Sequence, residues 1–248
     1  MKSVIIASDY VQDIQASSSP ALSARDVRER EIDVLAKVPV RDDEMLSLFR
    51  ALQMVLPEKQ HWTLGIVSTL PGEGASTIAR GLARTVARTP NAKVLICDVA
   101  RVGDRRNRSD RREREARGST CASIGDGDGR IDFTWLPGSQ QVAVGSFGDS
   151  AGLNALAADM DRVRSMVSNV SAGFELVILD LPPVNASVIG PALAKAVDGV
   201  VLVVEAERTR AQSVRATHKT LEMYGANVLG VVMNKRRFHI PSFIYRHL

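Results

Sequence analysis

Short apolar runs alternate along the chain with segments whose apolar positions recur at helical spacing. The runs are continuous and rich in valine, leucine and isoleucine, as in strands buried on both faces; they lie at 62–69, 93–98, 176–180, 199–204 and 228–234. The helical spacing predicts helices over 43–56, 76–88, 151–170, 191–197 and 209–224. Two shorter strands are expected near 133–136 and 142–144. This alternation predicts an α/β fold with a doubly wound, mostly parallel sheet and helices on both faces.

Two segments lack this patterning. Residues 1–42 contain scattered charge and little apolar sequence, and we expect a flexible N-terminal arm. Residues 103–130 are rich in arginine, aspartate and glycine, and we expect a mobile loop within a domain that spans 43–248. Ligands of such sheets bind at the carboxyl ends of the strands, where Thr69, Asp98, Asp180 and Asn234 fall.

Composition narrows the class of protein. The 248 residues carry 4% aromatic side chains, and no apolar run approaches the ~20 residues that a membrane helix needs. Two cysteines are too few for a disulfide scaffold, so we expect a reduced, cytoplasmic protein. The net charge of +4 is concentrated in eight arginines between 101 and 117. A solvated loop is the simplest interpretation of this run, with an anionic partner as the alternative.

The first buried strand is followed by the turn TLPGEGAS at 69–76. A glycine turn that opens a helix presents backbone N–H groups to a phosphate, as in the P-loop pattern G-x-x-x-x-G-K-[ST]. Gly74 and Ser76 match the last glycine and the hydroxyl residue, whereas Thr69 and Ala75 replace the first glycine and the lysine. We interpret the turn as a degenerate P-loop whose nucleotide-binding residues are Gly72, Glu73, Gly74, Ala75, Ser76 and Thr77.

Acidic residues end two other strands. Asp180 follows LVIL, as a Walker B aspartate would, and Asp98 follows KVLIC. We expect both to be catalytic and to hold Mg²⁺ together with the hydroxyl of Ser76. One acid after a buried strand would be weak evidence, but two beside a glycine turn favour a nucleotide site.

Five blocks in this order resemble the bacterial tyrosine kinases (BY-kinases), the family that includes CpsD, CapB and the cytoplasmic domain of Wzc. They are STLPGEGASTIARGLA, VLICDVAR, FELVILDLPPV, VDGVVLVVEAERT and LGVVMNKRR, and the resemblance covers roughly 43–248. The family belongs to the MinD/ParA-like P-loop ATPases and serves capsule and exopolysaccharide systems. The resemblance implies ATP or ADP and Mg²⁺ as ligands. It also adds Arg101 as a nucleotide contact and Asn234 as an adenine contact, although Asn234 is equally well explained as a turn residue.

The departures from the family bear on activity. Ala75 replaces the P-loop lysine and Ala100 replaces the second acid of the DxDxR motif. The C-terminal tyrosine cluster is absent, which leaves Tyr245 as a possible phosphosite. The ring-forming E-x-x-R-x-x-R motif keeps Glu44 and Arg50 but has Ser47 between them. Loss of one charge-stabilising contact typically costs ~10²–10³ in rate, so the sequence leaves the enzymatic status open.

The leading hypothesis is a cytoplasmic pseudokinase of exopolysaccharide or capsule biosynthesis and export. It would regulate or scaffold a chain-length co-polymerase of the Wzz/PCP type and reach the inner membrane through this partner. A homo-oligomer is possible, and no specific nucleic acid is expected. The first alternative is an active Mg-ATP-dependent tyrosine autokinase or ATPase with an unconventional P-loop. The second alternative is a ParA/MinD-like positioning ATPase.

Overall fold

The computed structural model describes residues 40–99, 131–136, 141–147 and 159–236, together with the backbone of residues 4–7 and 121–124. These residues form a nine-stranded sheet in the order β1-β9-β8-β2-β7-β3-β6-β5-β4. Neighbouring strands are parallel except in the pairs β4–β5 and β5–β6, as the mostly parallel prediction requires. The strands are β1 (Val4–Ala7), β2 (Trp62–Ser68), β3 (Val94–Asp98), β4 (Cys121–Ile124), β5 (Ile131–Trp135), β6 (Val142–Phe147), β7 (Leu176–Asp180), β8 (Gly199–Glu205) and β9 (Val228–Asn234).

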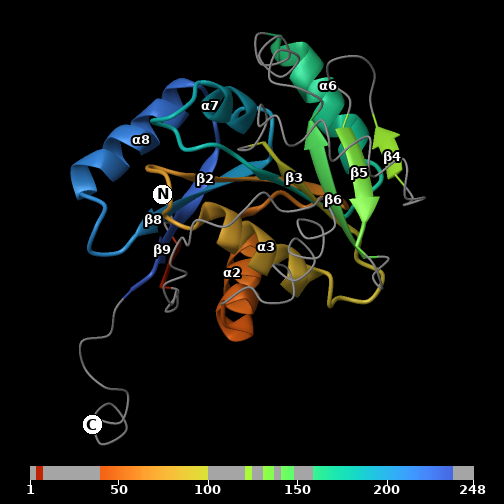
Figure 1. The fold of residues 1–248 in the computed structure, drawn as a ribbon, viewed down its shortest axis with the longest axis horizontal. Coiled ribbons are helices and arrows are strands. Elements are labelled where there is room, and N and C mark those ends of the chain that lie inside the picture. The colour runs from red at the N-terminus through yellow and green to blue at the C-terminus, as the bar shows by residue number, and fades with distance from the viewer. Residues whose placement is uncertain are drawn as a thin grey trace, which may run out of the picture.

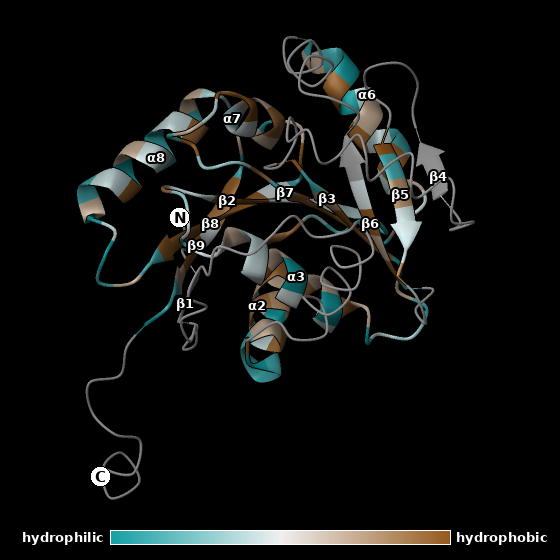
Figure 2. Cartoon of the chain, viewed as in Figure 1, coloured by the Kyte–Doolittle hydropathy of each residue, from teal (hydrophilic) through white to brown (hydrophobic). Residues whose placement is uncertain are grey.

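Helices cover both faces of this sheet, which gives three layers (Figure 1). On one face lie α2 (Asp42–Val55) and α3 (Ala75–Val86); on the other lie α6 (Met160–Ser171), α7 (Ile189–Ala194) and α8 (Ala211–Met223). Alternate strand side chains enter the two cores, so that Ile178 packs with α2 and α3 whereas Leu179 packs on the opposite face. The central strands are therefore hydrophobic along most of their length (Figure 2). This confirms the apolar runs of β2, β3, β7 and β8 as doubly buried strands, whereas β9 is only partly buried.

Two strands correct the sequence predictions. β1 lies within the segment 1–42 that we expected to be an arm, and it pairs in parallel with β9. β4 lies within the expected loop 103–130, and it pairs with β5. Both are four-residue strands, one at each outer edge of the sheet, and they are too short to produce a periodic signal. The predicted helix 151–170 begins at Met160 in the described part of the chain, since 151–158 lie outside it.

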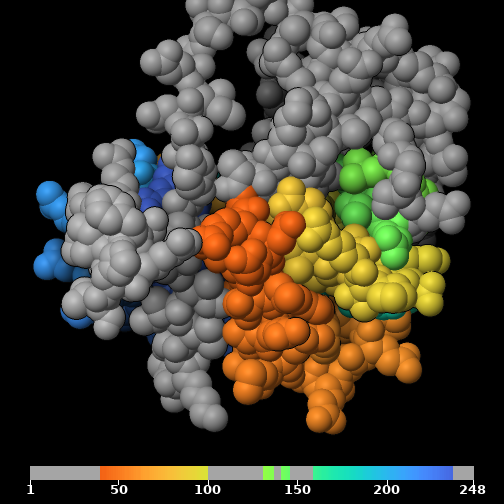
Figure 3. Space-filling model, turned by 90° about the horizontal axis from the view of Figure 1, so that it is seen from below, coloured from red at the N-terminus to blue at the C-terminus, as the bar shows by residue number. Residues whose placement is uncertain are grey.

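Helix α2 is fastened beside α3, and the two form one surface of the molecule (Figure 3). Arg84 of α3 and Arg88, which lies just after this helix, donate to the Asp42 carboxylate at 2.9 and 2.8 Å. The hydrogen bond from Arg88, with help from Arg84, holds the pKa of Asp42 below its usual value. Met45 and Leu48 are buried beneath this connection, so α2 packs its apolar side against the sheet and α3.

Among the described residues, no helix is both long enough and apolar enough to cross a bilayer.

Candidate functional site

The predicted site residues converge at the carboxyl ends of the parallel strands. β2 lies between β8 and β7, and it leads directly into the glycine turn. Asp98 at the end of β3 and Asp180 at the end of β7 are register partners on adjacent strands. Asn234 ends β9 beside Glu205, the last residue of β8. The acids therefore lie on one side of the turn and the amide lies on the other.

Two glycines determine the shape of the turn. Gly72 has φ +83° and Gly74 has φ +97°, a left-handed conformation that costs little only for glycine. Gly74 is the N-cap of α3, and its carbonyl oxygen accepts the N–H groups of Thr77 and Ile78, both at 3.0 Å. The predicted residues 72–77 thus form a P-loop-like turn and the first turn of a helix, whose N–H groups and positive dipole end suit an anion.

Glu73 fixes this turn from inside. Its side chain is 1% exposed, and one carboxylate oxygen accepts the backbone N–H of Leu70 at 2.7 Å. The other oxygen accepts the hydroxyl of Thr209, which lies just before α8. Both oxygens of the buried carboxylate are therefore bonded, and the turn is tied to the loop after β8.

The end of β9 holds the outer carbonyls of the same turn. The Asn234 side-chain amide donates to the Glu73 carbonyl oxygen at 2.9 Å, and the Lys235 ammonium donates to the Gly72 carbonyl oxygen at 2.7 Å. The sequence analysis did not identify Thr209 or Lys235 as functional. Lys235 directly follows a candidate site residue, and this adjacency was the one signal that would have identified it.

The Lys235 ammonium also forms an ion pair with Glu205. Glu205 accepts from Lys235 at 3.3 Å and from Arg208 at 2.9 Å. Burial would raise the pKa of the Glu205 carboxyl, but the hydrogen bonds from Arg208 and Lys235 more than offset this and hold its pKa below the usual value. Glu205 is therefore a carboxylate near neutral pH, and it anchors both cations.

The residues fit a nucleotide with one exception. Thr69 Oγ1 and Asn234 Oδ1 are buried, and neither has a hydrogen-bond partner in the described part of the chain. Buried polar atoms usually have partners, so these two suit the polar groups of a ligand. The exception is the Ala75 side chain, which is buried in the core beneath α3 and carries no charge for a phosphate.

Several residues named in the sequence analysis are not among the site residues described above. Ala100, Arg101 and Tyr245 lie outside the described residues, as does the arginine run. Ser47 of the ring-forming motif is exposed on α2, and its hydroxyl donates to the Asp43 carbonyl oxygen of the same helix at 2.8 Å. Arg50 is also exposed on α2.

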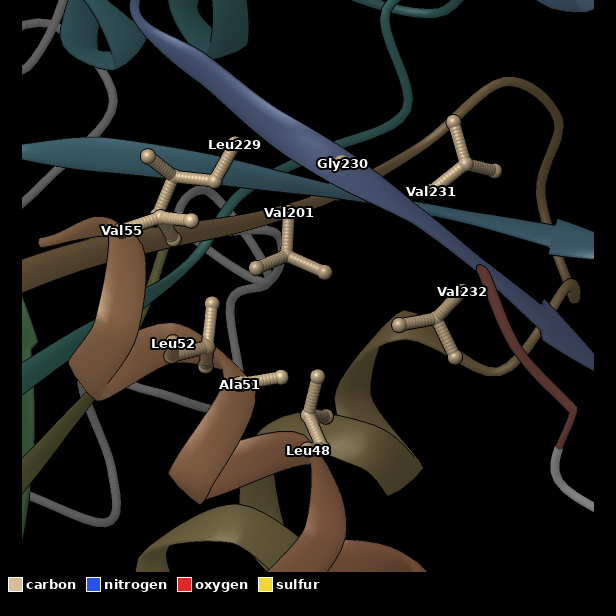
Figure 4. A pocket seen from close by; sticks show the side chains of 9 residues that line it. All are labelled: Leu48, Ala51, Leu52, Val55, Val201, Leu229, Gly230, Val231 and Val232. Carbon is tan, nitrogen blue, oxygen red and sulfur yellow. The ribbon is translucent and has the colours of Figure 1, made fainter. Parts of the chain in front are cut away.

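An apolar groove lies elsewhere, between α2 and the middle of β8 and β9 (Figure 4). Leu48 and Leu52 of α2 point toward Val201 and Val232 of the strands. Its lining is made of aliphatic residues and glycine, so the groove offers no group for phosphate or metal chemistry. The carboxyl edge of the sheet remains the candidate site.

Replacement of the turn glycines tests this geometry. A Cβ at Gly74 would overlap the Asn234 side-chain amide, whereas a Cβ at Gly72 would meet nothing within 4 Å. Gly72→Ala and Gly74→Ala should each lose about 1 kcal/mol of unfolding free energy for the left-handed backbone. Gly74→Ala should lose about 1–3 kcal/mol more because of the overlap. Adding Asn234→Ala to the Gly74→Ala variant should reduce this extra loss of unfolding free energy, because the overlapping amide is then absent. Urea unfolding measures this; equal losses in the two single variants would contradict the contact.

Comparison with known proteins agrees with this geometry. The chain is 27% identical over 191 residues to the tyrosine-protein kinase CpsD of Streptococcus agalactiae, which spans 75% of this chain and 80% of CpsD. The kinase domain of the Escherichia coli tyrosine kinase ETK superposes with a TM-score of 0.62 at 18% identity, over 93% of this chain and 88% of that one. The chimerical protein CapA2B2 superposes with a TM-score of 0.61 at 20% identity, over 87% of this chain and all of that one.

No family model matches the sequence. The homology to CpsD nevertheless extends over three quarters of the chain, and the sheet order and P-loop-like turn occur in a fold shared with tyrosine kinase domains. The chain is therefore similar in sequence to a bacterial tyrosine kinase and shares its fold with solved tyrosine kinase domains.

Proposed function

We propose that this chain is a cytoplasmic pseudokinase of exopolysaccharide or capsule biosynthesis and export. It regulates or scaffolds a membrane-bound chain-length co-polymerase, and any nucleotide that it binds acts as a ligand rather than as a phosphate donor. Similarity to tyrosine kinases such as CpsD supports the pathway.

The observation that carries the proposal is Ala75 in an otherwise formed P-loop. The left-handed glycines, the helix N-terminus and the two acids are in place, but position 75 holds a buried methyl group. Phosphoryl transfer depends on cations that stabilise the charge on the transferred group. Loss of one such contact typically slows the reaction ~10²–10³-fold, whereas backbone N–H groups still hold a phosphate.

We assign each part of a bound nucleotide to described residues of the site. The N–H groups of the turn and of the first turn of α3 bind phosphate oxygens, and the Ser76 hydroxyl is a ligand of Mg²⁺. Asp98 and Asp180 hold Mg²⁺ from the adjacent strands, which suits a cation that prefers carboxylate ligands. Asn234 Oδ1 accepts a hydrogen bond from an amino group of the base, because the amide nitrogen of Asn234 already donates to the Glu73 carbonyl oxygen.

The proposed partner rests on the resemblance to the bacterial tyrosine kinases, which implies a membrane protein of a capsule system. In the described part of this chain, no helix could cross a membrane. A co-polymerase of the inner membrane would then place the chain at the membrane surface.

The absence of kinase activity is the direct expectation. With radiolabelled Mg-ATP, the purified chain should show no measurable autophosphorylation. Ala75→Lys should bind ATP at least about tenfold more tightly than the natural chain, because it restores a charge-assisted contact to phosphate. Ala216→Lys, which adds the same charge at an exposed position of α8, should change nothing and serves as the control.

Strong Mg-ATP-dependent autophosphorylation of the natural chain would contradict the pseudokinase proposal. The active kinase would then be the correct alternative if Asp180→Ala abolished the turnover. Loss of the radiolabelled phosphate in the Tyr245→Phe variant would then identify Tyr245 as the residue that is phosphorylated.

Binding to the partner tests the second half of the proposal. The purified chain should sediment with proteoliposomes that carry a chain-length co-polymerase of the same system, and not with protein-free vesicles of the same lipids. Equal sedimentation with both would mean that lipid, rather than a protein partner, holds the chain.

A further inference from the structure

We propose that Lys235 is a positioning residue that orients and polarises the peptide groups of the P-loop-like turn. It thereby supplies part of the positive charge that is missing at position 75, through its contact with the Gly72 carbonyl oxygen. The inference rests on the nucleotide site of the proposed function. It attributes part of the affinity of that site for phosphate to Lys235, which lies outside the loop. Lys235 itself does not touch the phosphate in this account.

The direction of the peptide groups gives the first step. All described peptide bonds are trans, so the C=O and N–H of one peptide unit point in opposite directions. The Lys235 ammonium holds the C=O of Gly72, and the Asn234 amide holds the C=O of Glu73. The N–H groups of Glu73 and Gly74 share these two peptide units, and they therefore point away from β9 and toward the other side of the loop.

These two N–H groups are available to an anion. In the described part of the chain, neither the Glu73 N–H nor the Gly74 N–H donates to an acceptor. A cation that donates to a peptide oxygen also polarises the peptide, which makes the N–H on the opposite end a stronger donor. Lys235 thereby transmits positive character through the Gly72–Glu73 peptide to the position of a bound phosphate.

The fold holds Lys235 in this arrangement. Its backbone has φ +58°, a conformation that is costly for a residue with a side chain, and it turns the chain sharply after β9. Glu205 fixes the ammonium from the neighbouring strand, and Arg208 in turn fixes Glu205. With its side chain 26% exposed, Lys235 has enough protection from solvent for its charge to act on the peptide.

Three variants separate this role from general stability. Lys235→Met removes the charge and keeps the side-chain length, and Lys235→Arg retains a charged donor. Lys219→Met makes the same change at an exposed position of α8 and is the matched control.

The first measurement needs no ligand and no turnover. In the nuclear magnetic resonance spectrum of the unliganded chain, Lys235→Met should shift the Gly72 carbonyl carbon and the Glu73 amide, because their shared peptide loses a charged donor. Lys235→Arg should restore both signals most of the way, and Lys219→Met should leave them unchanged. Unchanged signals in Lys235→Met would overturn the proposal.

The second measurement is the affinity for inorganic pyrophosphate and for ADP by isothermal titration. Pyrophosphate has no base, so it reports on the loop alone. Lys235→Met should weaken both ligands about tenfold, the effect of one lost charge-assisted hydrogen bond, and Lys235→Arg should recover most of this loss. The proposal would be overturned by a loss for ADP alone, which would place Lys235 at the base, or by no pyrophosphate binding to the natural chain at millimolar concentration. Neither experiment measures autophosphorylation, so a result that overturns the role of Lys235 can be distinguished from one that overturns the pseudokinase proposal.

Discussion

A P-loop-like turn that lacks the P-loop lysine must be held in shape by the rest of the protein. In this chain four hydrogen bonds do so, and three of them come from the end of β9, the residue after it and the loop after β8. Glu73 accepts from Leu70 and Thr209, while the Glu73 and Gly72 carbonyl oxygens accept from Asn234 and Lys235. The loop is therefore held in shape by side chains that lie at or just beyond the carboxyl ends of β8 and β9. The packing of these two strands determines its geometry.

This constraint explains why a changed P-loop keeps its form. Replacement of the lysine by alanine removes charge, but the left-handed glycines and the contacts to β9 do not depend on that charge. The register of β3 and β7 likewise brings Asp98 and Asp180 together irrespective of position 75.

The sequence predicted the parts of the fold that have a strong local signal. The buried runs at Leu176–Asp180 and Val228–Asn234 coincide with β7 and β9, and the glycine turn lies where a P-loop was expected. β1 and β4 were missed because a four-residue strand takes its stability from its neighbour rather than from its own pattern. Lys235 was missed because its partner Gly72 is 163 residues away in the chain, and only the assembled sheet brings the two together.

The central claim is that the site keeps a phosphate cradle and has lost the cation that distinguishes a triphosphate. Isothermal titration of the natural chain with ATP and with ADP, each with and without Mg²⁺, tests this directly. The account predicts that, without Mg²⁺, ATP binds no more than about threefold more tightly than ADP, a difference below 1 kcal/mol. ATP binding at least about tenfold tighter than ADP binding without Mg²⁺ would contradict it, since the γ-phosphate would then have found a cation supplied by the protein.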